Sequence, residues 1–181
     1  MKRVELQRCA PQPWRNGGGL TRELLAWPAA ADWQLRVSVA HIERSGPFSA
    51  FPGVQRCFAV LQGAGVRLQL PAGECVLTPA SDAVAFDGAA APGCELIDGA
   101  TEDLNLMATH AAGHPRLLRA SAGSSIAGAA RWRGLFATEP AELTVSQQAQ
   151  AVAPGTLVWQ ADPAEPWHLA AGAGWWLSLH A

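Results

Sequence analysis

Tyrosine is absent from this chain of 181 residues, and lysine occurs only once, as Lys2. The 13 basic residues are scattered and the net charge is −2, so no concentrated positive field would attract DNA or RNA. No apolar run approaches the roughly 20 residues of a membrane-spanning helix. The start, "MKRVELQRCAPQPW", has no apolar stretch behind its basic pair, which argues against a secretory signal. We therefore expect a cytoplasmic protein that has neither nucleic acid nor membrane as a partner.

Paired metal-binding motifs are also missing. The four cysteines lie far apart and form no Cys-x-x-Cys pair, so we expect reduced, mostly buried thiols. Among the five histidines only His110 and His114 are close in sequence, and Gly113 and Pro115 interrupt the helix that such a metal-binding pair would need. We predict neither a structural zinc site nor another metal site from these residues.

Short alternating apolar runs, punctuated by 18 glycines and 13 prolines, indicate many short strands and an all-β barrel or sandwich. The clearest run is "DWQLRVSVAHI" (32–42), in which Leu35 and Val37 point to one face and Arg36 and Ser38 to the other. Further strands are expected at 73–79, 82–86 and 103–109. Residues 55–62 and 65–70 are predicted to pair as a hairpin across "GAG".

Two pairs of segments suggest an internal repeat. "RCFAVLQGAGVRL" (56–68) resembles "RGLFATEPAELTV" (133–145), and "GECVLTPASDAVAF" (73–86) resembles "GTLVWQADPAEPWHL" (155–169). We interpret the chain as two β-units, residues 1–115 and 116–181, connected by the Ala/Gly/Ser-rich stretch 120–134, which could instead hold a short helix.

The stretch "FSAFPGVQRCFAVLQGAG" (48–65) resembles the strand–loop–strand motif of cupins, which usually carries metal-binding histidines and a glutamate. When "FAVLQG" is aligned with the cupin turn, Arg56 occupies the glutamate position, Ala50 and Pro52 the histidine positions, and Val84 lies near the last histidine. None of these side chains coordinates a divalent cation. The resemblance implies an RmlC-like cupin built as a bicupin, with no metal and no other cofactor.

Three segments resemble the HutD family more specifically, which is also called HutD/Ves: "PWRNGGGLTRELL" (13–25), "RVSVAHIERSGPFSAFPGVQRCFAVLQGAG" (36–65) and "DLNLMATH" (103–110). The resemblance implies a metal-free bicupin associated with bacterial histidine utilisation. It also implies a protein that binds and senses or buffers a small anionic metabolite such as urocanate or formylglutamate.

The candidate binding residues centre on two arginines. Arg36 and Ser38 share a strand face, and Arg56 stands where a cupin would place a metal-binding carboxylate. If these side chains point into the barrel, the pocket would hold an anion instead of a cation; the alternative is that both arginines face solvent. A buried arginine needs an acidic neighbour or a ligand, and Glu23 and Asp103 are candidates for the neighbour. The remaining candidates are two residues of the glycine-rich start, one loop aromatic and two residues of the 103–109 strand: Trp14, Asn16, Phe48, Asn105 and Met107.

Two other functions stay open. A metal-free isomerase would need a positioned acid–base pair, but tyrosine is absent and alternation places His41 on the apolar face of its strand. Glu23 or Asp103 would serve as the base only if burial raised its pKa. We assign no catalytic residue. The Trp-rich end (158–179) would serve as core or as an interface of a structural module, and a homodimer is compatible with either.

Overall fold

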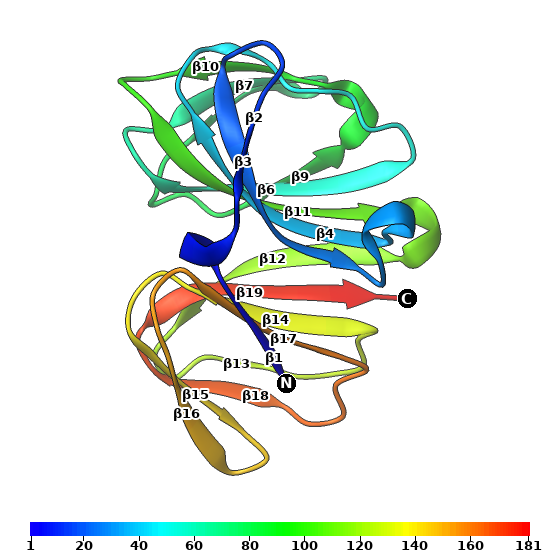
Figure 1. Cartoon of the computed structure of the whole chain (residues 1–181), viewed down its shortest axis with the longest axis vertical. Helices are drawn as coiled ribbons and strands as arrows, with labels where there is room; N and C mark the ends of the chain where they lie inside the picture. The colour runs from blue at the N-terminus through cyan, green and yellow to red at the C-terminus, as the bar shows by residue number, and fades with distance from the viewer. The chain divides into compact units, whose positions relative to one another are not determined.

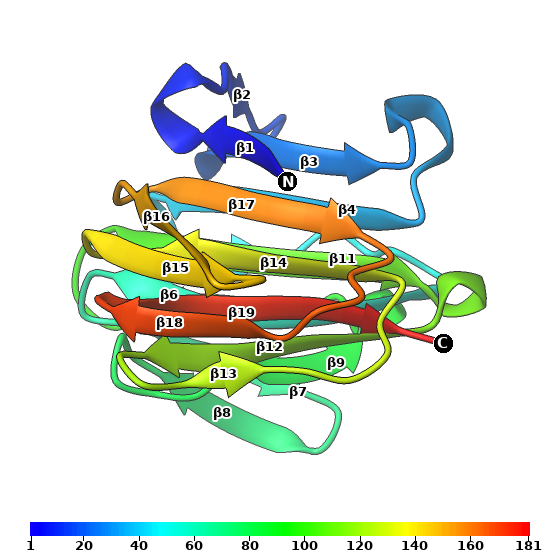
Figure 2. The same ribbon diagram turned by 90° about the horizontal axis from the view of Figure 1, so that it is seen from below.

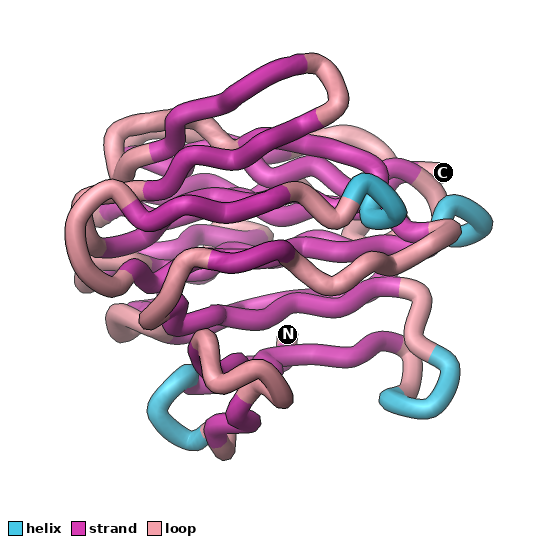
Figure 3. The backbone as a smooth tube through the Cα atoms, turned by 90° about the horizontal axis from the view of Figure 1, so that it is seen from above, coloured by secondary structure: helices cyan, strands magenta, loops and turns pink.

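The computed structural model describes all residues from 1 to 181. Its regular secondary structure consists of antiparallel strands and four single-turn 3-10 helices at Leu6–Arg8, Ala30–Asp32, Gly88–Ala90 and His110–Ala112 (Figure 3). The predicted all-β class is confirmed. The chain divides into two compact units: the first unit is Cys9–Ala112, and the second unit combines Met1–Arg8 with Gly113–Ala181. No helix is long and apolar enough to span a membrane.

The first unit contains two antiparallel sheets (Figure 1). The larger sheet has the order β2-β3-β4-β11-β6-β9, with bounds Pro11–Pro13, Gly19–Trp27, Leu35–Ile42, Thr101–Thr109, Val54–Gln62 and Val84–Asp87. The smaller sheet has the order β5-β10-β7-β8, with bounds Gly46–Pro47, Gly93–Leu96, Val66–Leu70 and Gly73–Leu77.

The second unit also contains two antiparallel sheets (Figure 2). The larger has the order β1-β17-β14-β19-β12, with bounds Lys2–Glu5, Thr156–Ala161, Trp132–Ala137, Ala173–His180 and His114–Ser121. The smaller has the order β13-β18-β15-β16, with bounds Ser125–Ile126, Trp167–Ala171, Ala141–Val145 and Gln148–Val152.

The first strand changes the division expected from the sequence. β1 pairs with β17 in antiparallel register, with Lys2 opposite Trp159 and Glu5 opposite Thr156. The start of the chain therefore belongs to the second unit and not to a unit spanning 1–115. The cause is a nonlocal edge pairing: without β1, one edge of β17 would be unpaired, and β1 satisfies the backbone hydrogen bonds of that edge.

The two units share the same arrangement of eight strands, to which β2 and β3 are added in the first unit and β1 in the second. β4-β11-β6-β9 of the first unit corresponds to β12-β19-β14-β17 of the second, and β5-β10-β7-β8 corresponds to β13-β18-β15-β16. The first sequence echo follows this correspondence, because it aligns buried Phe58 and Val60 of β6 with buried Leu135 and Ala137 of β14. It also aligns Arg56 with Arg133. The second echo is wrong: β8 corresponds to β16, whereas residues 156–161 form β17, the counterpart of β9.

Two local expectations also fail. β6 and β7 do not pair as a hairpin, because β6 lies between β11 and β9 in the larger sheet while β7 lies in the smaller one. "GAG" is thus a crossing between sheets. The predicted connection 120–134 contains no helix; it holds the end of β12, the short β13 and the start of β14.

The polar face of β4 points into the first unit. Ala40 and Ile42 pack in the core with Phe58 and Val60, so the alternation of the strand places Ser38 and Arg36 on the same inward face. The larger sheet thus presents a row of polar groups to the interior.

The start of β3 gives a test of the packing. A Cβ on Gly19 would lie 2.2 Å from the carbonyl oxygen of His41 on the paired strand, so the backbone must shift. We expect Gly19→Ala to lower the free energy of unfolding by about 1–3 kcal/mol in urea titrations. Gly46→Ala is the matched control, because its Cβ would meet nothing within 4 Å. Equal stabilities of the two variants would contradict the strand pairing.

Candidate functional site

The centre of the candidate site is Arg56, which lies on the inward face of β6. The residue is only 8% exposed. Its Nε donates a hydrogen bond of 2.9 Å to Oδ1 of Asn105, and Nη2 donates to the same oxygen. The guanidinium carbon lies 4.2 Å from the ring centroid of Phe48, and the rings of Phe86 and Phe58 lie slightly farther away. The cation is therefore enclosed by three aromatic rings and one neutral amide.

No carboxylate pairs with Arg56. The ion pairs of the structure join other residues, and the guanidinium uses Nε and Nη2 only on Asn105. Burial lowers the pKa of Arg56 to about 10, which still leaves the group charged at neutral pH. Cation–π contacts offset part of the desolvation cost, but an uncompensated buried charge remains expensive.

Asp103 is the nearest acid on β11 and is completely buried. Thr101 donates its hydroxyl to Oδ2 at 2.7 Å, whereas Oδ1 has no hydrogen-bond partner. Desolvation raises the pKa of Asp103 to about 7, against the smaller lowering effects of Thr101 and Arg56. Burial likewise raises the pKa of the nearby Cys94 thiol to about 12, so this thiol stays protonated.

Arg36 differs from Arg56 because an acid neutralises it. Its Nε donates to Oε2 of Glu23 at 2.6 Å, which is the acidic neighbour that the sequence allowed. Ser38 is buried on the same strand face, and Met107 lies opposite both arginines, pairing in register with Arg36 of β4 and Arg56 of β6.

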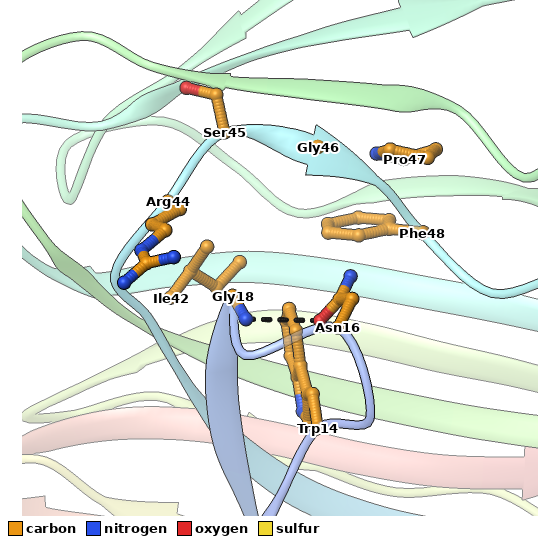
Figure 4. Close-up of a pocket in the computed structure, with 9 residues that line it drawn as sticks. All are labelled: Trp14, Asn16, Gly18, Ile42, Arg44, Ser45, Gly46, Pro47 and Phe48. Carbon is orange, nitrogen blue, oxygen red and sulfur yellow. Dashed lines mark hydrogen bonds between the residues drawn. The ribbon is translucent and has the colours of Figure 1, made fainter.

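A hollow of about 220 Å³ lies beside this cluster, and its wall includes Phe48 (Figure 4). Trp14 and Asn16 form another part of the wall. The indole of Trp14 donates to Thr21 Oγ1 at 2.8 Å, and Asn16 Oδ1 accepts from the backbone N–H of Gly18 at 3.0 Å. The lining consists of Trp14, Asn16, Gly18, Ile42, Arg44, Ser45, Gly46, Pro47 and Phe48.

The predicted binding residues thus form two groups. Trp14, Asn16 and Phe48 line the hollow, whereas the other six lie on the inner face of the larger sheet and do not line it: Arg36, Ser38, Arg56, Asp103, Asn105 and Met107. Phe48 connects the two groups, because it lines the hollow and its ring also contacts the guanidinium of Arg56. Arg44 and Ser45 also line the hollow but were not among the predicted binding residues, although both lie in the segment 36–65; the available signal was a basic residue beside the stretch "GPFSAFPG" (46–53).

No group of three or more His, Cys, Asp or Glu side chains is arranged to hold a metal ion. His180 bonds to Ser178 and to the carbonyl of Ala129, and His168 bonds to Ser125, so both have structural partners. The four tryptophans of the Trp-rich end are all buried, as expected for core residues: Trp159, Trp167, Trp175 and Trp176.

The fold is that of the cupins. A cupin 2 conserved barrel domain protein from Leptotrichia buccalis superposes with a TM-score of 0.58 at 10% identity, covering 99% of this chain and 96% of that one. The family follows from the sequence: the HutD family model matches residues 6–177, and the chain belongs to the HutD family.

Individual relatives agree with this assignment. An uncharacterised 21.2 kDa protein of the hutC 3' region of Pseudomonas putida is 41% identical over 97 residues, which are 52% of this chain and 51% of the relative. The protein Ves of Citrobacter koseri is 40% identical over 70 residues, 38% of this chain and 37% of Ves. The chain thus spans about half or less of the curated relatives it matches. HutD from Pseudomonas fluorescens SBW25 superposes with a TM-score of 0.86 at 26% identity, covering 99% of this chain and 97% of that one.

The Arg36–Glu23 pair generates a stability test. Both side chains are less than a third exposed, so the ion pair is partly shielded from solvent. We expect Glu23→Gln to destabilise the protein by about 1–2 kcal/mol, because it leaves Arg36 uncompensated. A double-mutant cycle with Arg36→Met should give a coupling of about 1 kcal/mol in urea unfolding. Additive effects would contradict the pairing.

Asp103 generates a pH test. Its folded pKa of about 7 exceeds the ordinary aspartate value of 3.8, so between these values the folded state holds a proton that the unfolded state has lost. Stability should therefore fall as the pH rises from about 4 to 7, by at most about 1.4 kcal/mol per unit from this group. We expect Asp103→Asn to remove this component from a series of urea titrations. A variant whose stability tracks that of the parent at every pH would contradict the raised pKa.

Proposed function

We propose that the first unit binds a small carboxylate without a metal ion, and that Arg56 is the group that holds it. The observation that carries the proposal is the buried guanidinium without an ion pair. A carboxylate would supply the missing negative charge and would match the fork geometry of arginine, in surroundings where charge-assisted hydrogen bonds are strong.

The second unit provides an internal comparison. Arg133 of β14 is the counterpart of Arg56 and is 1% exposed. Its Nη1 and Nη2 donate hydrogen bonds of 2.7 Å to the backbone carbonyls of Glu165 and Gly128. Two oxygens thus occupy the two terminal nitrogens of Arg133, whereas Arg56 has a single amide oxygen. We infer that the two oxygens of a carboxylate take a comparable place at Arg56.

The hollow supplies the approach to Arg56. Its volume of about 220 Å³ corresponds to about seven water molecules at liquid density, which suits a small metabolite. Arg44 places a second cation on the wall, and the flat sides of Trp14 and Phe48 would contact a planar or extended ligand. Phe48 lines the hollow and its ring centroid lies 4.2 Å from the guanidinium carbon of Arg56, so we infer that the ring turns aside when a ligand reaches Arg56.

Membership of the HutD family and the relative from a hutC region support a role in histidine utilisation. Urocanate and formylglutamate are the carboxylates we propose as ligands, with the protein sensing or buffering one of them. Urocanate is planar and fits the aromatic walls; formylglutamate has a second carboxylate that would lie near Arg44.

A thermal-shift titration tests the proposal. We expect urocanate or formylglutamate to raise the melting temperature of chelator-treated protein saturably, by an amount that grows with ligand concentration over Kd. Arg56→Met should remove the shift, because it deletes the charge but keeps an apolar side chain beneath Phe48.

Arg67→Gln is the matched control. It removes one positive charge from the same unit, but Arg67 is exposed, pairs with Glu74 and does not line the hollow. It should retain the full shift. Equal shifts in the parent and in Arg56→Met would overturn the role of Arg56, and the absence of a shift with either compound would overturn the proposed ligands.

A further inference from the structure

Carboxylate binding at Arg56 does not by itself explain the environment of the Asp103 carboxyl. It is fully buried, it lies on the same inward strand face as Asn105, and Asn105 is the residue that orients Arg56. Only Oδ2 has a partner, the hydroxyl of Thr101; Oδ1 is unpartnered. A buried ionised carboxylate would require several donors, so this environment suits a neutral acid with one open position.

We propose that a carboxylate binding at Arg56 and a proton on Asp103 stabilise each other, so that the complex retains this proton where the free protein would release it. The inference rests on the proposed function. When Asp103 is neutral, the positive charge of Arg56 is uncompensated and free for the ligand. When Asp103 is ionised, it competes with the ligand for that charge, and two carboxylates around one guanidinium repel each other.

The other charged and titratable groups around Asp103 do not change charge near neutral pH in a way that would replace the proton of Asp103. Arg36 is neutralised by Glu23, Cys94 stays protonated, and the pKa of Arg56 near 10 keeps the guanidinium charged through the neutral range. Glu102 adds only a minor repulsion that favours the protonated form of Asp103. Asp103, with a pKa of about 7, is thus the group among these that changes charge near neutrality. The facing groups come from β3, β4, β6, β10 and β11: Glu23, Arg36, Arg56, Cys94 and Glu102.

The experiment is a calorimetric titration with formylglutamate at several pH values from 5.5 to 8.5, a range in which the carboxyl and amide groups of this probe do not titrate. We expect the affinity to weaken about tenfold between pH 7 and 8.5, because each pH unit above the free-protein pKa costs up to about a factor of ten. Titrations in buffers of different ionisation enthalpy should show about one proton taken up per ligand at pH 8.

Asp103→Asn is the decisive variant, since asparagine imitates the neutral acid. We expect its affinity to be nearly independent of pH and, at pH 8.5, tighter than that of the parent. A purely structural role of Asp103 would instead weaken binding at every pH. The variant keeps all five histidines, so any pH dependence that they cause remains in both proteins.

The outcomes separate this inference from the proposed function. Binding that requires Arg56 but is equally strong at all pH values, without proton uptake, overturns the coupling and leaves carboxylate binding intact. Absence of binding at every pH, in the parent and in Asp103→Asn, overturns both.

Discussion

The site depends on one constraint, the burial of the Arg56 guanidinium without a counter-ion. Three aromatic rings and one amide oxygen reduce the cost of this arrangement, but they supply no negative charge. Replacement of a buried ionic group by apolar side chains is often neutral or stabilising. A contribution to stability therefore does not account for an arginine that is buried without an ion pair. Its position beneath Phe48, beside a hollow that carries a second arginine, is instead suited to holding an anion in a place that water screens weakly.

The duplicated topology allows Arg56 to be compared with an arginine at the corresponding position of the second unit. Arg56 and Arg133 occupy corresponding positions on corresponding strands, yet their environments differ. In the second unit the backbone carbonyls of Glu165 and Gly128 accept hydrogen bonds from both terminal nitrogens of Arg133, and its buried Nε has no hydrogen-bond partner. In the first unit the acceptor for Arg56 is the side-chain amide oxygen of Asn105, which takes hydrogen bonds from Nε and Nη2. One copy of the motif thus has both terminal nitrogens bonded within the chain, whereas in the other Nη2 bonds to Asn105 and Nη1 stays available to a ligand.

Strand alternation is a local property, so the sequence separated the two faces of β4 correctly, with Leu35 and Val37 on one face and Arg36 and Ser38 on the other. Alternation did not decide which face points inward, because that depends on the packing of the second sheet of the unit. The sequence-based prediction was wrong where pairing between strands distant in sequence determines the structure. A short glycine loop such as "GAG" serves a hairpin and a crossing between sheets equally well, and nothing near β1 indicates that it pairs with β17. Arg44 escaped notice because loops have no periodicity. The two acids were candidate partners for arginine, but only packing distinguishes Glu23, which pairs with Arg36, from Asp103, which has an open oxygen.

The charges of the side chains around Arg56 limit how many carboxylates of a ligand can bind in the inner part of the site. Arg36 and Glu23 cancel, so with Asp103 neutral the interior around Arg56 carries one positive charge. One carboxylate neutralises it. A second carboxylate at the same depth would be an unpaired buried anion, which costs several kcal/mol even after relaxation, on the order of the penalty for any buried ion. A ligand with two carboxylates must therefore keep the second one at the hollow, where Arg44 lies, and the distance between its acidic groups becomes a criterion for binding. A ligand with one carboxylate and a flat apolar body needs no such second contact.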